Sequence, residues 1–238
     1  MKSSYRRGGK YFALKMASTF HGKGNGMMML CSAENGEPVA YLADKGHLTD
    51  VRTAAVSAMV ARELGRRDTS IGILGAGIQA RLTARFHRGV LPLEKVYLWG
   101  RDAGKAARCA EEIGATVVKT PADLAAATKL IVTCTAARRP LLYSRDLQPG
   151  THISAVGADS VGKQELDPEI LRMADLLLVD SLAQCEKLGE LQHAVDLREK
   201  AVEIGAFCEH PGAAENSVAD LTGLGVEDLF IAEMIYEA

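Results

Sequence analysis

The sequence predicts an α/β protein in which a doubly wound parallel sheet is joined to a smaller α+β domain. Three observations favour this fold class. Short apolar runs alternate with helical stretches between residues 69 and 180, which is typical of a parallel sheet covered by helices on both faces. A glycine-rich turn follows the first of these runs. The residues before this region carry the signals of antiparallel strands.

The N-terminal region, residues 10 to 43, predicts an antiparallel segment. Three apolar runs have strand character: Tyr11–Leu14, Met27–Leu30 and Pro38–Leu42. Asn35-Gly36, between the last two runs, is a typical hairpin turn. From Leu48 onward, apolar residues recur at helical spacing behind Thr49, which we expect to cap the helix.

The alternating region supplies the strands of the parallel sheet. The predicted strands are Ser70–Leu74, Lys95–Trp99, Thr116–Val118, Leu130–Thr133, Ile153–Ala155 and Leu176–Val179. Helices are expected to begin at Ile78 and Ala103, after the first two strands. The remainder, residues 181 to 238, is predicted to be mostly helical.

Composition limits the classes of partner. The 238 residues include 28 Lys and Arg against 30 Asp and Glu, so the chain has no overall positive charge to attract nucleic acid or an anionic membrane. Its apolar stretches are far shorter than the roughly 20 residues that span a bilayer. Neither the five cysteines nor the six histidines show metal-ligand spacing. We therefore expect a cytoplasmic protein with reduced thiols, a small-molecule partner and no metal.

The glycine-rich turn predicts a dinucleotide site of the Rossmann type. The motif consists of Gly75, Ala76, Gly77, Ile78, Gln79 and Ala80. Gly75 permits a tight turn, Gly77 lets the backbone approach a pyrophosphate, and the small Ala80 allows close helix packing. The N-terminus of the helix offers amide groups and a positive dipole to the phosphates. The alternative is a purely structural turn between strand and helix.

The end of the second strand of this unit indicates which cofactor is bound. A carboxylate there would accept a hydrogen bond from the ribose 2′-hydroxyl of NAD, but the strand ends in Gly100-Arg101. Arg101, supported by Lys105 or Arg108, would favour a 2′-phosphate. We therefore expect a slight preference for NADP(H) over NAD(H). In the alternative interpretation Arg101 is a solvated surface charge and Asp102 holds NAD.

Three charged residues outside the glycine motif are candidates for chemistry. Lys15 stands between apolar residues within a predicted strand, Arg52 lies near the start of a helix, and Asp159 follows a later strand. A lysine in such a strand must extend to solvent or find an anion. Each has a simpler explanation: Lys15 on an exposed edge strand, Arg52 paired with Asp50, and Asp159 in an Asx turn beside Gly157.

Several motifs together resemble a known family. They are Leu48–Ala55, Gly75–Arg81, Pro149–His152, Val156–Asp159, Gly162–Leu166, Val179–Ser181 with Gly189-Glu190, and Asp220–Asp228. In this order they are similar to the ornithine cyclodeaminase/mu-crystallin family, from near residue 2 to the C-terminus. The resemblance implies an NAD(P)-dependent oxidoreductase or cyclodeaminase of small amino or imino acids, with hydride transfer at the α-carbon.

The resemblance also implies a two-domain subunit that forms a homodimer. We expect residues 56–199 to form the dinucleotide-binding domain, and residues 1–55 with 200–238 to form a substrate-binding and dimerisation domain. The family normally has a further N-terminal segment, which supplies strands and a substrate-facing arginine, and this sequence starts after it. The alternative function is therefore an NADPH-binding protein, similar to mu-crystallin, with little or no catalysis.

By position, the resemblance assigns roles to individual residues. Lys15 and Arg52 look like the residues that bind the substrate carboxylate, and Lys2 looks like a further basic position. Lys15 is also a candidate proton donor, and Asp159 looks like the acidic catalytic residue, next to the amine or iminium. We further expect two residues near later strand ends, Thr133 and Gly157, at the cofactor site.

Overall fold

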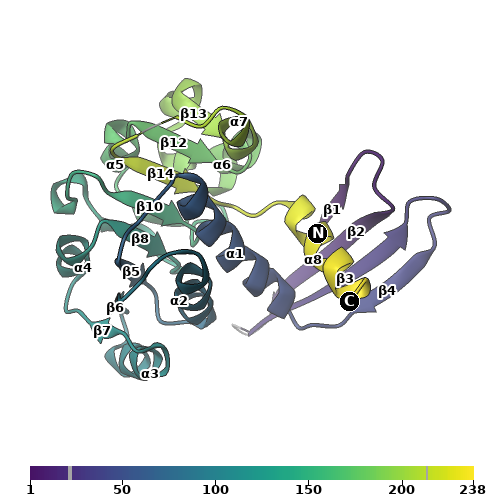
Figure 1. The fold of residues 1–238 in the computed structure, drawn as a ribbon, viewed down its shortest axis with the longest axis horizontal. Helices are drawn as coiled ribbons and strands as arrows, with labels where there is room; N and C mark the ends of the chain where they lie inside the picture. The colour runs from purple at the N-terminus through teal and green to yellow at the C-terminus, as the bar shows by residue number, and fades with distance from the viewer. Residues whose placement is uncertain (21–22, 213) are drawn as a thin grey trace. The chain divides into compact units, whose positions relative to one another are not determined.

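The computed structural model describes residues 1–20, 23–212 and 214–238 and divides the chain into two compact units. Unit 1 consists of residues 1–53 and 223–238, and unit 2 consists of residues 54–222. The predicted fold class is confirmed, because unit 2 contains an eight-stranded parallel sheet and unit 1 a four-stranded antiparallel sheet (Figure 1).

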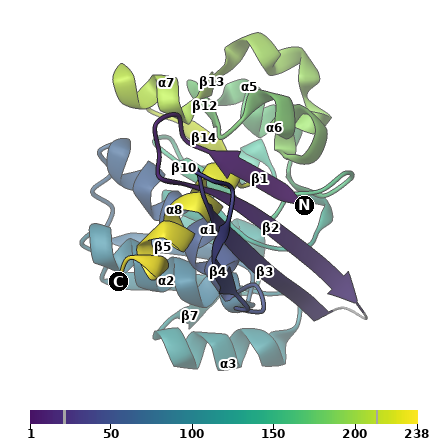
Figure 2. The same ribbon diagram turned by 90° about the vertical axis from the view of Figure 1, so that its right-hand side faces the viewer.

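Unit 1 is an antiparallel sheet with a helix against one face. Its strands, in sheet order, are β1 (Lys2–Tyr5), β2 (Tyr11–Phe20), β3 (Lys23–Ser32) and β4 (Pro38–Leu42). Helix α8 (Gly225–Tyr236) packs on β1, β2 and β3 (Figure 2). The buried core joins Ala13, Met28 and Leu30 to Leu229 and Ala232. Because side chains alternate along a strand, Lys15 faces α8 together with Ala13, whereas Leu14 lies on the opposite face.

Two local predictions for unit 1 have different outcomes. The Asn35-Gly36 turn between β3 and β4 is confirmed, with Gly36 at a φ of 80° that favours glycine. The cap at Thr49 is wrong, because helix α1 (His47–Glu63) begins earlier. Asp44 Oδ2 instead accepts the backbone N–H of Leu48 at 2.6 Å.

The main sheet of unit 2 has eight strands, and all of them are parallel. In sheet order they are β13 (Ala201–Glu203), β12 (Leu176–Val179), β14 (Ser217–Asp220), β10 (His152–Ala155), β8 (Leu130–Thr133), β5 (Ser70–Leu74), β6 (Lys95–Trp99) and β7 (Thr116–Val117). The chain runs outward from β5 to β7 and then returns to the other side of β5 at β8. In such sheets ligands bind at this switch point, beyond the carboxyl ends of the strands.

Helices and short segments complete unit 2. From Ala54 onward α1 belongs to this unit. The further helices are α2 (Ile78–Val90), α3 (Ala103–Ile113), α4 (Pro121–Ala127), α5 (Pro168–Met173), α6 (Leu182–Leu188) and α7 (Ile204–Glu209). Three 3₁₀ segments occur: η1 (Ser144–Asp146), η2 (Glu190–His193) and η3 (Val195–Lys200). Two further strands, β9 (Arg138–Leu142) and β11 (Gln164–Leu166), form a small parallel pair. Within the described residues, no helix is both long and apolar enough to cross a membrane.

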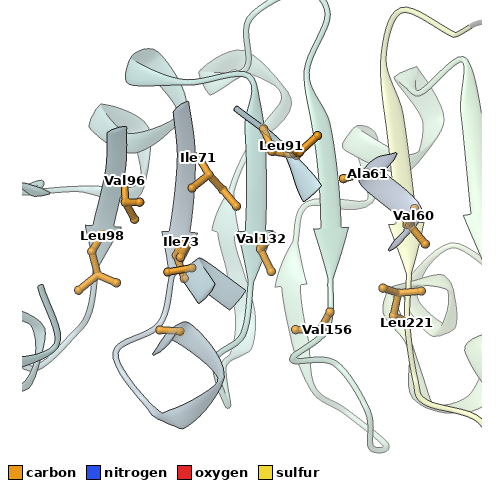
Figure 3. Packing of buried hydrophobic residues seen from close by; sticks show 14 of the residues in the cluster. Val60, Ala61, Ile71, Ile73, Leu91, Val96, Leu98, Val132, Val156 and Leu221 are labelled. Atoms are coloured by element: carbon orange, nitrogen blue, oxygen red, sulfur yellow. The ribbon is translucent and has the colours of Figure 1, made fainter. Parts of the chain in front are cut away.

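Aliphatic side chains fill both faces of the central sheet. On one face, Ile71 and Ile73 of β5 pack beside Val96 and Leu98 of β6 and Val132 of β8 (Figure 3). These near-continuous apolar runs are expected where a parallel strand is covered on both sides. The packed core gives the loops at the strand ends a rigid base.

The C-terminal region departs from the sequence prediction. Residues 181–238 were expected to be mostly helical, but β13 and β14 lie there. Residues 200–222 also fall in unit 2 rather than in the smaller domain, because both strands hydrogen-bond to β12 in the parallel sheet. β14 is only four residues long and carries a serine and an aspartate, so its apolar pattern is weak.

Candidate functional site

A pocket of about 400 Å³ opens at the carboxyl ends of β5, β6 and β8. It is lined by Gly75, Ala76, Gly77, Trp99, Gly100, Arg101, Asp102, Lys105, Cys134, Thr135, Ala136, Ala137 and Leu141. This is the switch point of the sheet, so the glycine motif lies where the topology favours a nucleotide.

The glycine motif fits a dinucleotide. Gly75 has a φ of 139°, and a Cβ there would stand 2.6 Å from Cys134 Sγ, so only glycine is tolerated. Gly77 faces open space, with no described atom within 4 Å of the place a Cβ would take. No described side chain caps α2. The structure describes every residue in the first turn of this helix, and none of them is acidic. Its amide groups are therefore available to a phosphate.

Arg81 braces this turn from within the helix. Its Nη1 donates to the carbonyl oxygens of Ala76 and Gly77 at 3.3 and 3.0 Å, and its Nη2 donates to Glu112 at 2.7 Å. Hydrogen bonds from a charged guanidinium hold the loop in one conformation. The buried Ala80 packs in the core at the same helix end, as its small size predicted.

The end of β6 supplies charged groups to the same pocket. Gly100 is close-packed, since a Cβ there would lie 3.0 Å from the Cβ of Ala76. Arg101 and Lys105 both line the pocket. Asp102 caps α3 by accepting the backbone N–H of Lys105 at 2.9 Å, and this bond lowers the pKa of its carboxyl group. The carboxylate proposed in the alternative interpretation is therefore engaged by its own helix.

Thr133 and Gly157 lie just behind the pocket wall rather than on it. The Thr133 hydroxyl donates to Glu165 Oε2 at 2.7 Å, and the Gly157 N–H donates to the same oxygen at 3.0 Å. Glu165 Oε1 accepts the N–H of Thr135, a pocket residue, at 2.6 Å. Their direct contact with a cofactor remains a prediction, whereas their shared partner Glu165 was not predicted.

Unit 1 brings Lys15 and Arg52 together through two carboxylates of α8. Lys15 Nζ lies 2.9 and 2.8 Å from the two oxygens of Asp228, and Arg52 Nε donates to Asp228 Oδ1 at 3.1 Å. Arg52 Nη1 also pairs with Glu227 Oε2 at 2.6 Å. Lys15 is 5% and Arg52 8% exposed, so Lys15 is not on an exposed edge, and Arg52 pairs with both carboxylates of α8.

This cluster, which we call the unit 1 ion cluster, consists of Lys2, Lys15, Arg52, Glu227 and Asp228. Burial, and then the nearby Arg52, lower the pKa of Lys15, although Asp228 opposes the shift. Lys2 is the register partner of Lys15 on β1, and its ammonium group donates to the carbonyl of residue 223. The structure therefore assembles all three predicted basic residues within unit 1.

Glycine at position 223 makes room for the cluster. Gly223 has a φ of 80°, and a Cβ there would collide with the Arg52 guanidinium. The same residue accepts the Lys2 hydrogen bond through its carbonyl oxygen. A side chain at position 223 would thus displace Arg52 as well as strain the backbone.

Asp159 lies in unit 2, in the loop after β10. Its side chain is 50% exposed and accepts from the Ser160 hydroxyl at 3.0 Å and from Lys163 Nζ at 2.5 Å. Both partners are side chains of the same loop. Its catalytic role remains a prediction.

Several carboxylates of the two units were missed by the sequence reasoning. Glu165 belongs to the quoted motif Gly162–Leu166, and Glu227 and Asp228 close the motif that begins at Asp220, so the resemblance already marked their segments. Their pairing with distant residues could not be derived from spacing. Among the described residues, which leave out His21, no group of three or more His, Cys, Asp or Glu side chains is placed to hold a metal.

Comparison with known proteins agrees with this geometry. The model of the ornithine cyclodeaminase/mu-crystallin family matches residues 9–238. A cyclodeaminase of Sinorhizobium fredii, described as uncharacterized, is 36% identical over 261 aligned positions, which cover 100% of this chain and 79% of the relative.

Solved structures show the same fold. The iminosuccinate reductase of Paracoccus denitrificans in complex with NAD⁺ aligns with a TM-score of 0.86 at 30% identity, over 96% of this chain and 76% of that chain. An archaeal alanine dehydrogenase dimer with bound NAD aligns with a TM-score of 0.87 at 28% identity, over 96% of this chain and 77% of that chain. Family model, relative and structures agree over nearly the whole length, and the chain belongs to the ornithine cyclodeaminase/mu-crystallin family.

Proposed function

We propose that this protein is an NAD(P)-dependent oxidoreductase or cyclodeaminase that acts on small amino or imino acids by hydride transfer at the α-carbon. The observation that carries the proposal is the glycine-lined pocket at the switch point of the sheet, within a chain whose structural relatives include two with bound NAD. The bound nicotinamide would accept or supply the hydride. The protein residues have to hold it, bind the substrate carboxylate and handle protons.

The unit 1 ion cluster suits the carboxylate of such a substrate. Arg52 offers a planar fork and Lys15 a compact charge, and both are buried. The lowered pKa of Lys15 brings its ammonium group closer to releasing a proton near neutral pH, as a donor to an imine nitrogen requires. In this proposal Lys2 adds charge and Asp159 stabilises the iminium or accepts a proton from the amine.

The first experiment tests cofactor binding without any substrate. Trp99 is the only tryptophan of the chain, and it lines the pocket, so its fluorescence reports the binding of a dinucleotide. We expect NADH and NADPH to quench Trp99 in a saturable way. The second experiment offers Δ1-pyrroline-2-carboxylate with NADPH and follows the loss of absorbance. Asp159→Asn should abolish this turnover and leave quenching intact, and loss of both would show that Asp159 is structural.

We further propose that NADP(H) is preferred over NAD(H). Arg101 and Lys105 line the pocket, and Asp102 is used as a helix cap. Arg101→Asp should shift the ratio of NADPH to NADH affinity toward NADH by about tenfold, because one charge-assisted hydrogen bond to a phosphate is lost. Arg88→Asp, in the last turn of α2, makes the same charge change away from the pocket and should leave the ratio unchanged. An unchanged ratio in Arg101→Asp would contradict the assignment.

A second candidate function is NADPH binding with little or no catalysis. It is favoured by one observation: Asp228 and Glu227 already engage the cations that would bind a substrate carboxylate. Saturable quenching of Trp99 without turnover of a panel of cyclic imines, or of keto acids with amines, would support this candidate over the enzyme.

We also propose that the protein is a homodimer that pairs through unit 1. The sheet face opposite α8 exposes apolar side chains: Met16 is 48% and Tyr41 59% exposed. The archaeal alanine dehydrogenase relative is a dimer. Sedimentation analysis should give twice the chain mass, and Tyr41→Lys should shift it toward the monomer because it places a charge on this face.

A further inference from the structure

Glu165 is a buried carboxylate behind the wall of the cofactor pocket. It lies on β11 and is fully buried. Its hydrogen-bond donors come from two segments that follow strands of the main sheet: Thr133 and Thr135 at the end of β8, and Gly157 after β10. Thr135 is part of the pocket wall, and Gly157 leads to Asp159. One side chain therefore ties together the carboxyl ends of two neighbouring strands.

The surroundings of Glu165 leave little freedom. A Cβ on Gly157 would collide with the Glu165 carboxylate and with the carbonyl of Thr135, so the two segments meet only because residue 157 is glycine. Close packing of this kind, with a hydrogen bond to each oxygen, fixes the carboxylate in one position. Displacing it would move Thr135 and Gly157 together.

Two further carboxylates fix the strand that carries Glu165. Glu190 accepts the backbone N–H groups of Glu165 and Leu166 at 2.8 and 3.1 Å. Asp220 accepts the N–H groups of Glu190 and Leu191, both at 2.9 Å. We call Glu165, Glu190 and Asp220 the carboxylate chain. It runs from the end of β14 to the pocket wall through backbone amides rather than through basic side chains.

We propose that Glu165 is a positioning residue for cofactor binding, which sets the Thr135 wall of the pocket and the start of the Asp159 loop through its hydrogen bonds to Thr133, Thr135 and Gly157. The inference rests on the proposed function, since it concerns the affinity for a nicotinamide dinucleotide. Glu165 acts through Thr135 and Gly157, whereas the glycine motif acts on the phosphates.

Glu165→Gln tests this role with almost no change of volume. Backbone amides donate to both carboxylate oxygens, and glutamine has only one oxygen. In either orientation its NH₂ group faces an amide N–H, of Thr135 or of Gly157. We expect the dissociation constant for NADH, measured by Trp99 quenching, to rise about tenfold, which corresponds to one lost charge-assisted hydrogen bond.

Asp220→Asn is the matched control. Asp220 is equally buried and also accepts one backbone amide on each oxygen, so asparagine creates the same donor-to-donor contact. Its partners Glu190 and Leu191 are not among the described residues that line the pocket. Both variants should lower the thermal midpoint, but Glu165→Gln should weaken NADH binding more, because Asp220 reaches Thr135 only indirectly, through Glu190 and Glu165. A purely structural role of Glu165 predicts instead that the two variants lose NADH affinity equally.

The outcomes separate this inference from the proposed function. If the wild-type protein binds neither NADH nor NADPH, both are overturned. If the wild type binds and Glu165→Gln binds equally well, or Asp220→Asn weakens binding as much, only the positioning role is overturned. Should Glu165→Gln not fold, Thr133→Val removes one donor to the carboxylate and keeps the side-chain shape. A threefold weaker affinity for NADH supports the role, and an unchanged affinity overturns it.

Discussion

The two units bury charged side chains in opposite ways. In unit 1, the cations Lys15 and Arg52 are matched by the carboxylates of Asp228 and Glu227. In unit 2, the carboxylate chain of Glu165, Glu190 and Asp220 is matched mainly by backbone amides. A buried charge requires a partner in either case, because uncompensated desolvation is costly.

The difference is in how easily the partner can be exchanged. The carboxylate of a substrate can bind to Lys15 or Arg52 beside Asp228 or in its place, since ammonium and guanidinium groups donate hydrogen bonds to any suitably placed anion. A backbone amide belongs to the fold and cannot be replaced without moving a strand end. We infer that the ion cluster suits binding and that the carboxylate chain suits support.

The largest expected effect on stability is that of Asp228→Asn. Removing the charge of Asp228 from this buried cluster leaves Lys15 and Arg52 less well compensated, which should lower the free energy of unfolding by about 3 to 5 kcal/mol. Urea unfolding of the variant measures it. The same denaturation of Lys15→Met with Asp228→Leu, which removes a cation and an anion together, should show a smaller loss than the two single changes combined.

If Asp228→Asn lowers the free energy of unfolding by less than about 1 kcal/mol, the comparison is contradicted, because a solvent-exposed ion pair contributes that little. A double variant as unstable as the sum of the single variants would show that Lys15 and Asp228 do not act as a pair. Either result would remove the reason for treating the unit 1 ion cluster as exchangeable.

The same contrast explains what the sequence could predict. The Gly75–Ala80 turn follows from local rules, because tight turns, small residues and free helix amides are specified by neighbours in the chain. Lys15 within a strand already required an anion, but its partner Asp228 lies 213 residues away. No periodicity encodes such a distance.

The fold shows the same division: elements with a strong local signal were predicted, and those that depend on distant residues were not. Strands with long apolar runs, such as Ser70–Leu74, were found, because a parallel strand buried on both faces has a strong signal. Strand β14 was missed, because its Asp220 is polar and looks unsuited to a core. Its burial depends on amides of η2 that become its neighbours only in the folded chain.

The next effect concerns pH and distinguishes the two regions. Burial raises the pKa of Asp220 to about 7 from 3.8, although the amides of Leu191 and Glu190 oppose the shift. A carboxyl group with a raised pKa in the folded state stabilises it below pH 3.8, and this contribution is lost as the pH rises through 7. Between pH 6 and pH 8 the wild type should therefore lose about 1.4 kcal/mol relative to Asp220→Asn.

Urea denaturation of both proteins at several pH values measures this difference, and the variant serves as the reference for the titrating groups whose pKa Asp220 does not influence. Parallel curves for the two proteins would contradict the prediction and would show that the amides of η2 keep Asp220 ionised throughout.

Within the unit 1 ion cluster, the smallest expected loss of stability is that of Lys2→Met. Lys2 is half-buried and donates to the carbonyl of residue 223, so its loss should lower the free energy of unfolding by about 1 kcal/mol. Lys10→Met, which removes an exposed pair with Glu237 in the same unit, should have less effect.

Because Lys2 also lowers the pKa of Lys15, its removal should leave Lys15 a weaker acid. If the ion cluster is built for binding, Lys2→Met raises the KM for the imine far more than Lys10→Met does, with a loss of stability of only about 1 kcal/mol. Equal KM values would place Lys2 with the supporting groups and confine the exchangeable part of the cluster to Lys15 and Arg52.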